Sequence, residues 1–266
     1  MKVYDCIMYF DEDLILELRL NILNQFVDKF VIVEATRNHA GEKKELNFDI
    51  KKFDKFKNKI IYLIVDDIPE KVENYKKGWS PNFFRENFNR NAISRALTEC
   101  SPDDLILISD ADEIPNLELL NTTNIKKFAI FKQKSFIYKL NLLKETGWLG
   151  SSICYKKFLK SPQWLRNKRF LRRGFFRRVF FKTQILDNGG WHFSFLKTAK
   201  DIKKKLNAYA HSEYKDIADI DTIEENIKSN TCFIEKKNLK RILIDETYPP
   251  YIRENKDLYS DWILKN

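Results

Sequence analysis

Short apolar runs alternate with amphipathic segments along the first half of the chain. Four runs have the length and the β-branched content of buried strands, at residues 3–10, 29–35, 59–65 and 104–109. Apolar residues recur at helical spacing over residues 15–26, and a second helical pattern covers residues 83–100. Strands that alternate with helices are typical of an α/β domain. We therefore predict a mostly parallel central sheet flanked by helices.

The second half of the chain has a less regular pattern. Residues 128–140 predict a further strand, and helices are predicted at residues 198–210, 221–230 and 251–264. Two adjacent glycines in Gly189-Gly190-Trp191-His192 favour a tight turn or a β-bulge. The sequence has no internal repeat and no low-complexity linker, so we expect a single domain over residues 1–266.

The composition excludes several classes of protein. Hydrophobic residues make up 43% and aromatic residues 14% of the 266 positions, well above the content of a disordered or fibrous chain. The sequence holds no glycine-rich dinucleotide or phosphate loop, and its four cysteines are scattered without metal-site spacing. No apolar run approaches the roughly 20 residues that span a bilayer, and the amino end lacks the layout of a secretory signal. We therefore expect a cytoplasmic protein with reduced thiols.

Positive charge is concentrated in one part of the chain. The net charge is +10, and no Asp or Glu occurs between Thr146 and Leu186. The stretch 156–182 instead holds eleven cations: Lys156, Lys157, Lys160, Arg166, Lys168, Arg169, Arg172, Arg173, Arg177, Arg178 and Lys182. This surplus favours an anionic partner. Three partners remain open: a nucleotide diphosphate or phosphorylated acceptor, an anionic membrane that carries lipid-linked acceptors, and a nucleic acid whose bases would stack on the interleaved phenylalanines.

One pair of carboxylates differs in context from the other two Asp-x-Asp triplets. The triplets at 11–13 and 219–221 open predicted helices, where acids commonly complement the helix dipole. Asp110 and Asp112 instead end a buried strand, and residues two apart point to the same side of a strand. Their oxygens suit Mn²⁺ or Mg²⁺ shared with a diphosphate. The structural alternative is that both acids only cap the helix that follows.

Two metal-dependent reactions fit a pair of acids at the end of a strand. A phosphatase would use the first Asp as a nucleophile, but its motif expects Thr or Val where Ile114 stands. Glycosyl transfer from a nucleotide sugar needs no such residue and can use the basic stretch. A nucleic-acid-binding protein is disfavoured because the carboxylates would repel a phosphate backbone. We therefore favour a glycosyltransferase, with the phosphatase and the nucleic-acid-binding protein as alternatives.

Further polar residues follow a strand or begin a helix on the same predicted face of the sheet. Glu34 ends the second strand, and His39 lies in the polar loop after it, where open α/β sheets bind ligands. The second predicted helix has donors for a diphosphate and a ribose near its start, namely Arg85, Arg90 and Asn91. We expect these residues, together with Asp110, to bind the donor.

Five longer segments give the sequence a family resemblance. They are YDCIMYFDE at 4–12, VIVEATRNHAG at 31–41, RENFNRNAI at 85–93, SDADEIP at 109–115 and GGWHFS at 189–194. In this order they make the sequence resemble glycosyltransferase family 17, the β-1,4-mannosyl-glycoprotein N-acetylglucosaminyltransferase-like group. The resemblance implies a GT-A-type fold and metal-dependent transfer of N-acetylglucosamine from UDP-GlcNAc to an acceptor sugar, with inversion. Use of another nucleotide sugar is the alternative.

The resemblance also implies roles for individual residues. Asp110 and Asp112 match the family's metal and donor motif, and His192 corresponds to a late histidine that reaches the metal in many GT-A-type enzymes. Eukaryotic members carry a membrane anchor and a stem that have no counterpart here. We therefore expect a cytoplasmic enzyme that builds a bacterial or viral surface glycan and can contact the inner face of the membrane. On this view residues 1–125 form the nucleotide-sugar-binding half and residues 126–266 the acceptor-side half.

Inversion also needs a general base near the acceptor hydroxyl. Glu113 adjoins Asp112 and is the first candidate, so the candidate catalytic residues are Asp110, Asp112 and Glu113. Its rivals are Glu145, Asp187 and Glu213. Planar side chains that could stack on sugar rings are Trp79, Trp148 and Trp191, and His211 is a further candidate for a metal ligand or an acceptor contact.

Overall fold

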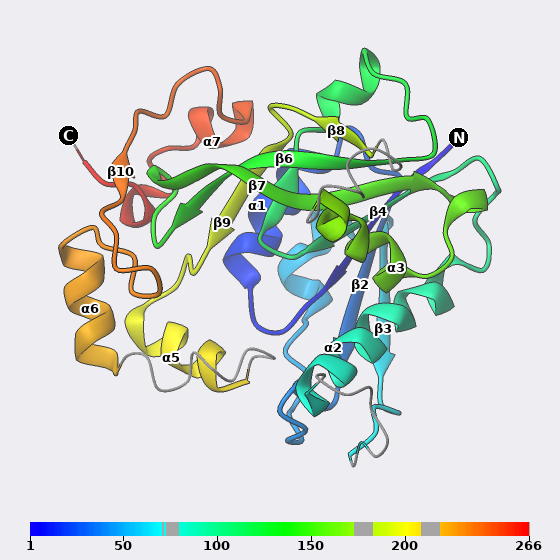
Figure 1. The fold of residues 1–266 in the computed structure, drawn as a ribbon, viewed down its shortest axis with the longest axis horizontal. Coiled ribbons are helices and arrows are strands. Elements are labelled where there is room, and N and C mark those ends of the chain that lie inside the picture. The colour runs from blue at the N-terminus through cyan, green and yellow to red at the C-terminus, as the bar shows by residue number, and fades with distance from the viewer. Residues whose placement is uncertain (71, 73–79, 173–182, 209–218, 266) are drawn as a thin grey trace.

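The computed structural model describes residues 1–70, 72, 80–172, 183–208 and 219–265, which form one ten-stranded sheet with helices on both faces (Figure 1). The first four strands are β1 (Val3–Met8), β2 (Lys29–Ala35), β3 (Ile60–Val65) and β4 (Leu105–Asp110). They lie in the order β3-β2-β1-β4, and each neighbouring pair is parallel. The prediction of an α/β domain with a mostly parallel sheet is confirmed, while its assignment to the GT-A type stays a prediction.

Helices cover both faces of the parallel strands because alternate strand residues point to opposite faces. Ile7 of β1 belongs to the hydrophobic core under α1 (Asp13–Leu23), and Cys6 belongs to the core on the other face. That second core includes Leu97, which follows α2 (Pro81–Ala92), and Leu165 of α3 (Pro162–Arg166). The helices α2 and α3 therefore share the face opposite α1.

The second half of the chain extends the sheet with strands of both directions. These strands are β5 (Glu113–Pro115), β6 (Phe128–Ile137), β7 (Leu142–Tyr155), β8 (Gln184–Leu186), β9 (Gly190–Ser194) and β10 (Lys240–Arg241). The long strand β7 pairs antiparallel with both β4 and β6, and β6 pairs parallel with β9. β5 pairs antiparallel with β9 and ends the sheet. This path places the residues just after β4 beside β9.

The segment with two glycines is a strand rather than the predicted turn or bulge. The turn lies earlier, at residues 187–188, and β9 begins at Gly190. Gly190 has φ +119, and a Cβ there would lie 2.3 Å from the carbonyl oxygen of Ile114. A Cβ on Gly189 would lie 2.6 Å from the backbone nitrogen of Lys132. The glycines therefore allow a close approach to β5 and β6, which is the second common reason for glycine in a strand.

The later helices follow the sequence pattern in part. Helices α5 (Ala199–Ala208) and α6 (Ile220–Lys228) match two predicted helices. The third prediction, over residues 251–264, is wrong: α7 (Pro250–Glu254) is short, and successive turns follow it. Ile252 of α7 and Tyr259 of the following turns are both buried. Short 3₁₀ helices lie at Ile50–Phe56, Ile93–Leu97, Leu117–Asn121, Lys156–Phe158, Asn167–Arg172 and Ser260–Trp262.

Two consequences of this arrangement bear on function. Within the described residues, no helix combines the length and the apolar content that crossing a bilayer requires. The carboxyl ends of β1, β2 and β4 meet at one edge of the sheet, and the chain leaves β4 at Asp110. The Asp-Ala-Asp segment is therefore at this edge, where ligands bind in open α/β sheets.

Candidate active site

The carboxyl ends of β1, β2 and β4 border a cleft, called here the first cleft. It encloses about 740 Å³ of empty space, part of which is open to solvent. The charged residues of its lining are Glu12, Arg37, Lys44, Glu86, Arg90, Asp110, Asp112 and Lys205, and His39 also lines it.

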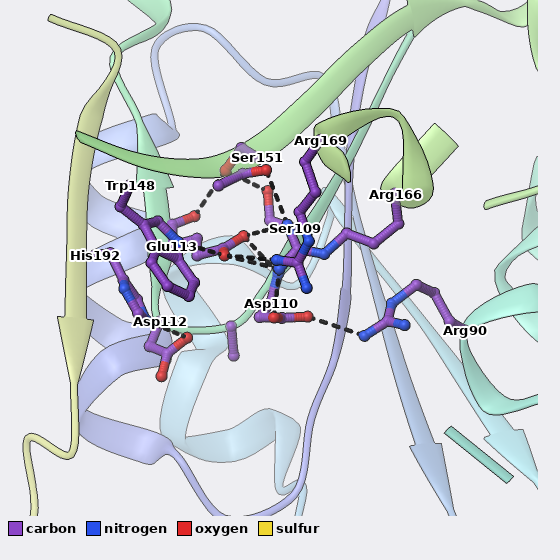
Figure 2. A network of polar contacts seen from close by, with 12 residues as sticks. Arg90, Ser109, Asp110, Asp112, Glu113, Trp148, Ser151, Arg166, Arg169 and His192 are labelled. Atoms are coloured by element: carbon purple, nitrogen blue, oxygen red, sulfur yellow. Dashed lines mark hydrogen bonds and ion pairs between the residues drawn. The ribbon is translucent and has the colours of Figure 1, made fainter. Parts of the chain in front are cut away.

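Asp110 ends β4 and is held by arginines from two helices (Figure 2). Arg90 Nη2 lies 3.1 Å from Oδ1, and Arg166 Nη2 forms an ion pair with Oδ2. Burial alone would raise the pKa of Asp110, but the positive charges of Arg166, Arg90 and Arg169 outweigh it and hold the pKa well below its usual range. Asp110 is therefore an ionised anchor whose two oxygens are both engaged.

Glu113 begins β5, and its carboxylate is fully buried under the same arginines (Figure 2). Arg166 donates to Oε2 at 2.6 Å and to Oε1 at 2.7 Å, and Trp148 Nε1 donates to Oε1 at 2.9 Å. The backbone N–H of Asp110 donates to Oε2 at 3.2 Å. A general base must reach the acceptor hydroxyl, and this carboxylate has no exposed surface. The geometry does not support Glu113 as the base; it positions Arg166.

A second buried arginine holds the backbone of the same turn. Arg19 of α1 donates to both carboxylate oxygens of Asp5 in β1, at 2.6 and 2.7 Å. Its Nη1 also donates to the carbonyl oxygens of Glu113 and Ala111, at 2.5 and 3.4 Å. Both charged side chains are buried, at 0% and 1% exposure. The turn at residues 110–113 is therefore fixed through its side chains by Arg166 and through its carbonyls by Arg19.

Asp112 has a different environment from Asp110. Its Oδ1 lies 3.6 Å from His192 Nε2, and its Oδ2 lies 3.5 Å from Lys205 Nζ of α5. Burial would raise the pKa of Asp112, but Lys205 and His192 outweigh it and lower the pKa to about 2. Trp148 stacks on the His192 ring with centroids 4.5 Å apart, and Ser135 Oγ lies 3.2 Å from Nδ1 (Figure 2). These contacts orient Nε2 of His192 toward Asp112.

The residues around Asp112 provide a partial metal site. In the part of the chain that the structure describes, no group of three His, Cys, Asp or Glu side chains could hold a metal by itself. Arginines engage both oxygens of Asp110, so the available ligands are Asp112 and His192. One carboxylate and one imidazole fit Mn²⁺ or Mg²⁺ when phosphate oxygens and water supply the remaining ligands. The residues therefore fit a metal that binds together with a diphosphate.

Comparison with known protein families supports an assignment for this site. The sequence profile of glycosyltransferase family 17 matches residues 1–249. The chain belongs to glycosyltransferase family 17. This result confirms the resemblance found in the five sequence segments, and it places the whole of the first cleft within the matched region.

Individual proteins similar to this family 17 chain include two curated mammalian enzymes. They are the β-1,4-mannosyl-glycoprotein 4-β-N-acetylglucosaminyltransferases of Rattus norvegicus and Homo sapiens, each 25% identical over 284 residues. The alignments cover 95% of this chain and 50% and 51% of the relatives, so the chain spans about half their length. Among solved structures, the 2-C-methyl-D-erythritol 4-phosphate cytidylyltransferase of Francisella tularensis is similar with 13% identity and a TM-score of 0.34, over 77% of this chain and 98% of that one. A score this low carries no argument.

The candidate site includes several of the residues that the sequence predicted. His39, Arg90, Asp110 and Asp112 line the first cleft, and His192 lies beside Asp112. Burial is the main cause that lowers the pKa of His39. Arg90 is 2% exposed, and besides Asp110 it pairs with Glu86 at 2.7 Å and donates to Gln163. Its charge therefore stabilises the wall of the cleft as well as Asp110.

Glu34 does not face the first cleft, contrary to the prediction. Its carboxylate is fully buried and accepts hydrogen bonds from Lys44 Nζ, the Tyr62 hydroxyl and the backbone N–H groups of Asn47 and Phe48. The next residue of β2, Ala35, lines the cleft instead. Successive side chains of a strand point to opposite sides. The end of β2 was therefore correctly predicted to border the cleft, but Ala35 rather than Glu34 faces it.

Arg85 and Asn91 also do not line the first cleft. Arg85 donates to three backbone carbonyls in the loops after β2 and β3, at 2.5–3.3 Å. Asn91 accepts from the backbone N–H of Gln163 at 3.0 Å and so joins α2 to α3. The charged residues of α2 that line the cleft are Glu86 and Arg90, which lie one helical turn apart. The predicted helix over 83–100 is α2 followed by a 3₁₀ helix, and of its three predicted residues Arg90 lines the cleft while Arg85 and Asn91 do not.

The remaining predicted residues lie away from the first cleft or outside the described residues. Asp187 is exposed and pairs with Lys132 at 2.8 Å, and Trp191 is part of the hydrophobic core. Glu145 lies on β7 and does not line the first cleft. The candidates Trp79, His211 and Glu213, together with the cations at 173–182, lie outside the described residues.

Sequence analysis missed three residues that the structure places at the site: Glu12, Arg19 and Lys205. Arg19 had a detectable signal, because it lies between Leu18 and Leu20 on a helix whose neighbouring positions are buried. A charged residue among buried positions must have a partner. Glu12 ends the first segment of the resemblance but was assigned no role, and Lys205 is one of several lysines in α5 with no distinguishing pattern.

Proposed function

We propose that this chain is a metal-dependent, inverting glycosyltransferase that moves N-acetylglucosamine from UDP-GlcNAc to a sugar hydroxyl of a glycan acceptor. Family membership supports glycosyl transfer, and the names of the rat and human relatives support N-acetylglucosamine as the transferred sugar. The observation that carries the proposal is the first cleft, where Asp110-Ala111-Asp112 follows the end of a central parallel strand. Transfer from a different nucleotide sugar is the alternative.

The first cleft has two chemically distinct ends for a nucleotide sugar. Arg37, His39 and Lys44 come from the loop after β2, while Asp112 and Lys205 lie where the loop after β4 meets α5. We assign the nucleoside to the first end and the diphosphate to the second. Lys205, 3.5 Å from Asp112, supplies a cation to the phosphates in this arrangement.

Asp112 and His192 are the residues that would hold the metal. When bound there, Mn²⁺ or Mg²⁺ would neutralise negative charge on the diphosphate as it leaves. Asp110 contributes differently, because its ion pairs with Arg90 and Arg166 fix the turn that presents Asp112. The motif thus combines one anchoring carboxylate with one ligand carboxylate.

Inversion occurs in a single displacement. The acceptor oxygen forms a bond to the anomeric carbon while the bond from that carbon to the phosphate oxygen breaks, and UDP leaves with the bonding electrons. We assign the proton of the acceptor hydroxyl to Glu12 rather than Glu113, because Glu12 lines both the first cleft and a second, adjoining one. The backbone N–H groups of Phe10 and Asp11 donate to Glu12 Oε2 at 3.0 and 3.1 Å and so hold its carboxylate in place.

Calorimetric titration of UDP-GlcNAc into the protein tests the donor and metal assignments together. We expect binding with Mn²⁺ present, weaker binding after EDTA treatment, and weaker binding of UDP-glucose and UDP-galactose. Asp112→Asn should remove the metal-dependent part of the affinity. Asp67→Asn is the matched control, because Asp67 is half exposed and pairs with Arg95 away from both clefts.

Two results would contradict the proposal. If no UDP-sugar binds with metal present, the donor class is wrong. If Asp112→Asn and Asp67→Asn bind UDP-GlcNAc with the same metal dependence, Asp112 is not the metal ligand. The predicted cytoplasmic location and membrane contact stay predictions, because much of the basic stretch, at 173–182, lies outside the described residues.

A further inference from the structure

A second cleft adjoins the first and encloses about 590 Å³ of empty space, part of it open to solvent. Its lining comes from the start of α1, from the segment between β9 and α5, and from Trp262 near the end of the chain. The two clefts share Glu12, Asp112 and Lys205. A group held in the second cleft would therefore reach the same acids that border the diphosphate end of the first.

Phe195 is the most unusual residue of the second cleft. It has φ +51, a left-handed conformation that is uncommon for a bulky residue. Its ring packs edge-on against Phe233 at 5.4 Å between centroids, and Lys205 Nζ lies 5.8 Å from the ring centre. Phe195 and its buried neighbour Leu196 both line the cleft. Uncommon backbone conformations persist where the surrounding structure enforces them, often at binding sites.

Carboxylates outnumber cations in the lining of the second cleft. The acids are Asp11, Glu12, Asp13, Asp112 and Asp201, and the cations are Lys197 and Lys205. Four lysines pair with these acids: Lys197 and Lys204 with Asp11 at 2.6 and 3.2 Å, Lys52 with Asp13 at 2.6 Å, and Lys205 with Glu12 at 3.3 Å. The five acids therefore keep a small surplus of negative charge, which disfavours a phosphorylated ligand. Sugar hydroxyls, in contrast, can donate hydrogen bonds to carboxylates while a ring face packs on an aromatic side chain.

We propose that the second cleft binds the acceptor as an uncharged saccharide, with one sugar ring on Phe195 and the reacting hydroxyl directed to the junction at Glu12. This inference rests on the proposed function and narrows it, because it excludes the phosphorylated acceptors that the sequence left open. The specificity of the cleft follows from its acids, and its affinity follows from the aromatic ring.

The test uses the full chain saturated with UDP and Mn²⁺, so that no transfer occurs, and measures binding by saturation-transfer NMR titration. The probes are the methyl glycosides of glucose, galactose and mannose and the 6-phosphates of the same sugars. We expect at least one methyl glycoside to bind, and its 6-phosphate to bind about tenfold more weakly or not at all. Phe195→Ala should weaken the methyl glycoside about five- to tenfold.

Two variants separate binding from folding. Phe158→Ala removes a half-buried ring that lines neither cleft and should leave sugar binding unchanged. Thr198→Trp adds bulk at an exposed position of the second cleft and should abolish sugar binding. The affinity for UDP with Mn²⁺ should be the same in all variants.

The proposal is overturned if the sugar phosphates bind as well as the methyl glycosides, if Thr198→Trp binds them like wild type, or if no methyl glycoside binds while UDP does. Loss of UDP and UDP-GlcNAc binding in the wild type is a different result, because it contradicts the donor assignment rather than the acceptor cleft. The two failures are therefore distinguishable.

Discussion

The two aspartates of Asp110-Ala111-Asp112 lie in contrasting environments although they share one turn. Asp110 has Arg90 and Arg166 on its two oxygens. Asp112 has weaker contacts, 3.5 and 3.6 Å long, with Lys205 and His192 at the junction of the two clefts. A motif of two identical acids thus holds one residue that fixes the turn and one that is available to a ligand. Substitution of Asp110 should therefore mainly affect stability, and substitution of Asp112 should mainly affect function.

The largest effect is expected from removing Arg166, which pairs with Asp110 and Glu113. Arg166→Met would leave Glu113 and Asp110 without their buried partner, and such a loss costs about 3–5 kcal/mol of the free energy of unfolding. Arg95→Met is the matched control, because Arg95 makes a two-point ion pair with Asp67 at the surface and should cost about 1 kcal/mol or less. Urea denaturation measures the free energy of unfolding of both variants. Equal losses in the two variants would contradict the larger contribution of the buried ion pairs.

The next effect separates the two aspartates directly. Asp112→Asn should lower kcat/KM by about 10²–10³-fold through the lost charge at the reacting diphosphate, with a change in unfolding free energy of about 1 kcal/mol or less. Asp110→Asn should instead lower the unfolding free energy by about 1.5–3 kcal/mol, because it weakens charged hydrogen bonds to Arg166 and Arg90. Thermal denaturation and transfer assays should be run on both variants. Equal losses of stability and equal losses of kcat/KM in the two variants would contradict the different roles of Asp110 and Asp112.

Glu12 and Glu113 offer a second contrast, between a carboxylate that lines both clefts and one that lines neither and has no exposed surface. Glu12→Gln should reduce kcat by about 10²–10⁴-fold while leaving the affinity for UDP-GlcNAc unchanged, since only proton transfer is lost. Glu113→Gln should mainly reduce stability, because its oxygens accept from Arg166 and Trp148. A Glu12→Gln enzyme with unchanged kcat would remove Glu12 from the role of base.

The smallest effect concerns His39, the imidazole of the first cleft. Burial lowers its pKa below the usual value of 6.5, so the unfolded chain binds the proton more readily than the folded chain does. The contribution of His39 to stability is therefore complete above about pH 6.5 and is lost as the pH falls below that value. His39→Gln should make the unfolding free energy less dependent on pH between 6.5 and 5, and an unchanged slope would contradict the assignment.

Local patterns predicted the parallel half of the fold well. The apolar runs of β1 to β4 and the helical spacing of α1 are properties of adjacent residues, so the sequence displays them directly. The strand β7 was missed because Lys144, Glu145, Thr146 and Gly147 interrupt its apolar pattern, and its partner β4 is distant in sequence. The strand β9 was mistaken for a turn because its glycines serve close packing rather than a reversal of the chain.

The candidate site was predictable where position along a strand decides it. Asp110 and Asp112 follow a buried strand, and their location at the edge of the sheet follows from that alone. Glu34 shows the limit of this rule, since its neighbour Ala35 faces the cleft. Arg19 and Arg166 could not be assigned because their partners are 14 and more than 50 residues away, and only the fold brings them together.

The position of Arg166 also has a consequence for the order of assembly during synthesis. The acids at 110–113 leave the ribosome well before Arg166, which follows β7 in the chain, and β7 pairs with β4 in the folded structure. Until that pairing is complete, the nascent chain carries Asp110 and Glu113 without their main counter-charge, which disfavours their burial. Contacts between distant segments form late in folding. We therefore expect the turn that presents Asp112 to become ordered near the end of folding, after the parallel strands that precede it.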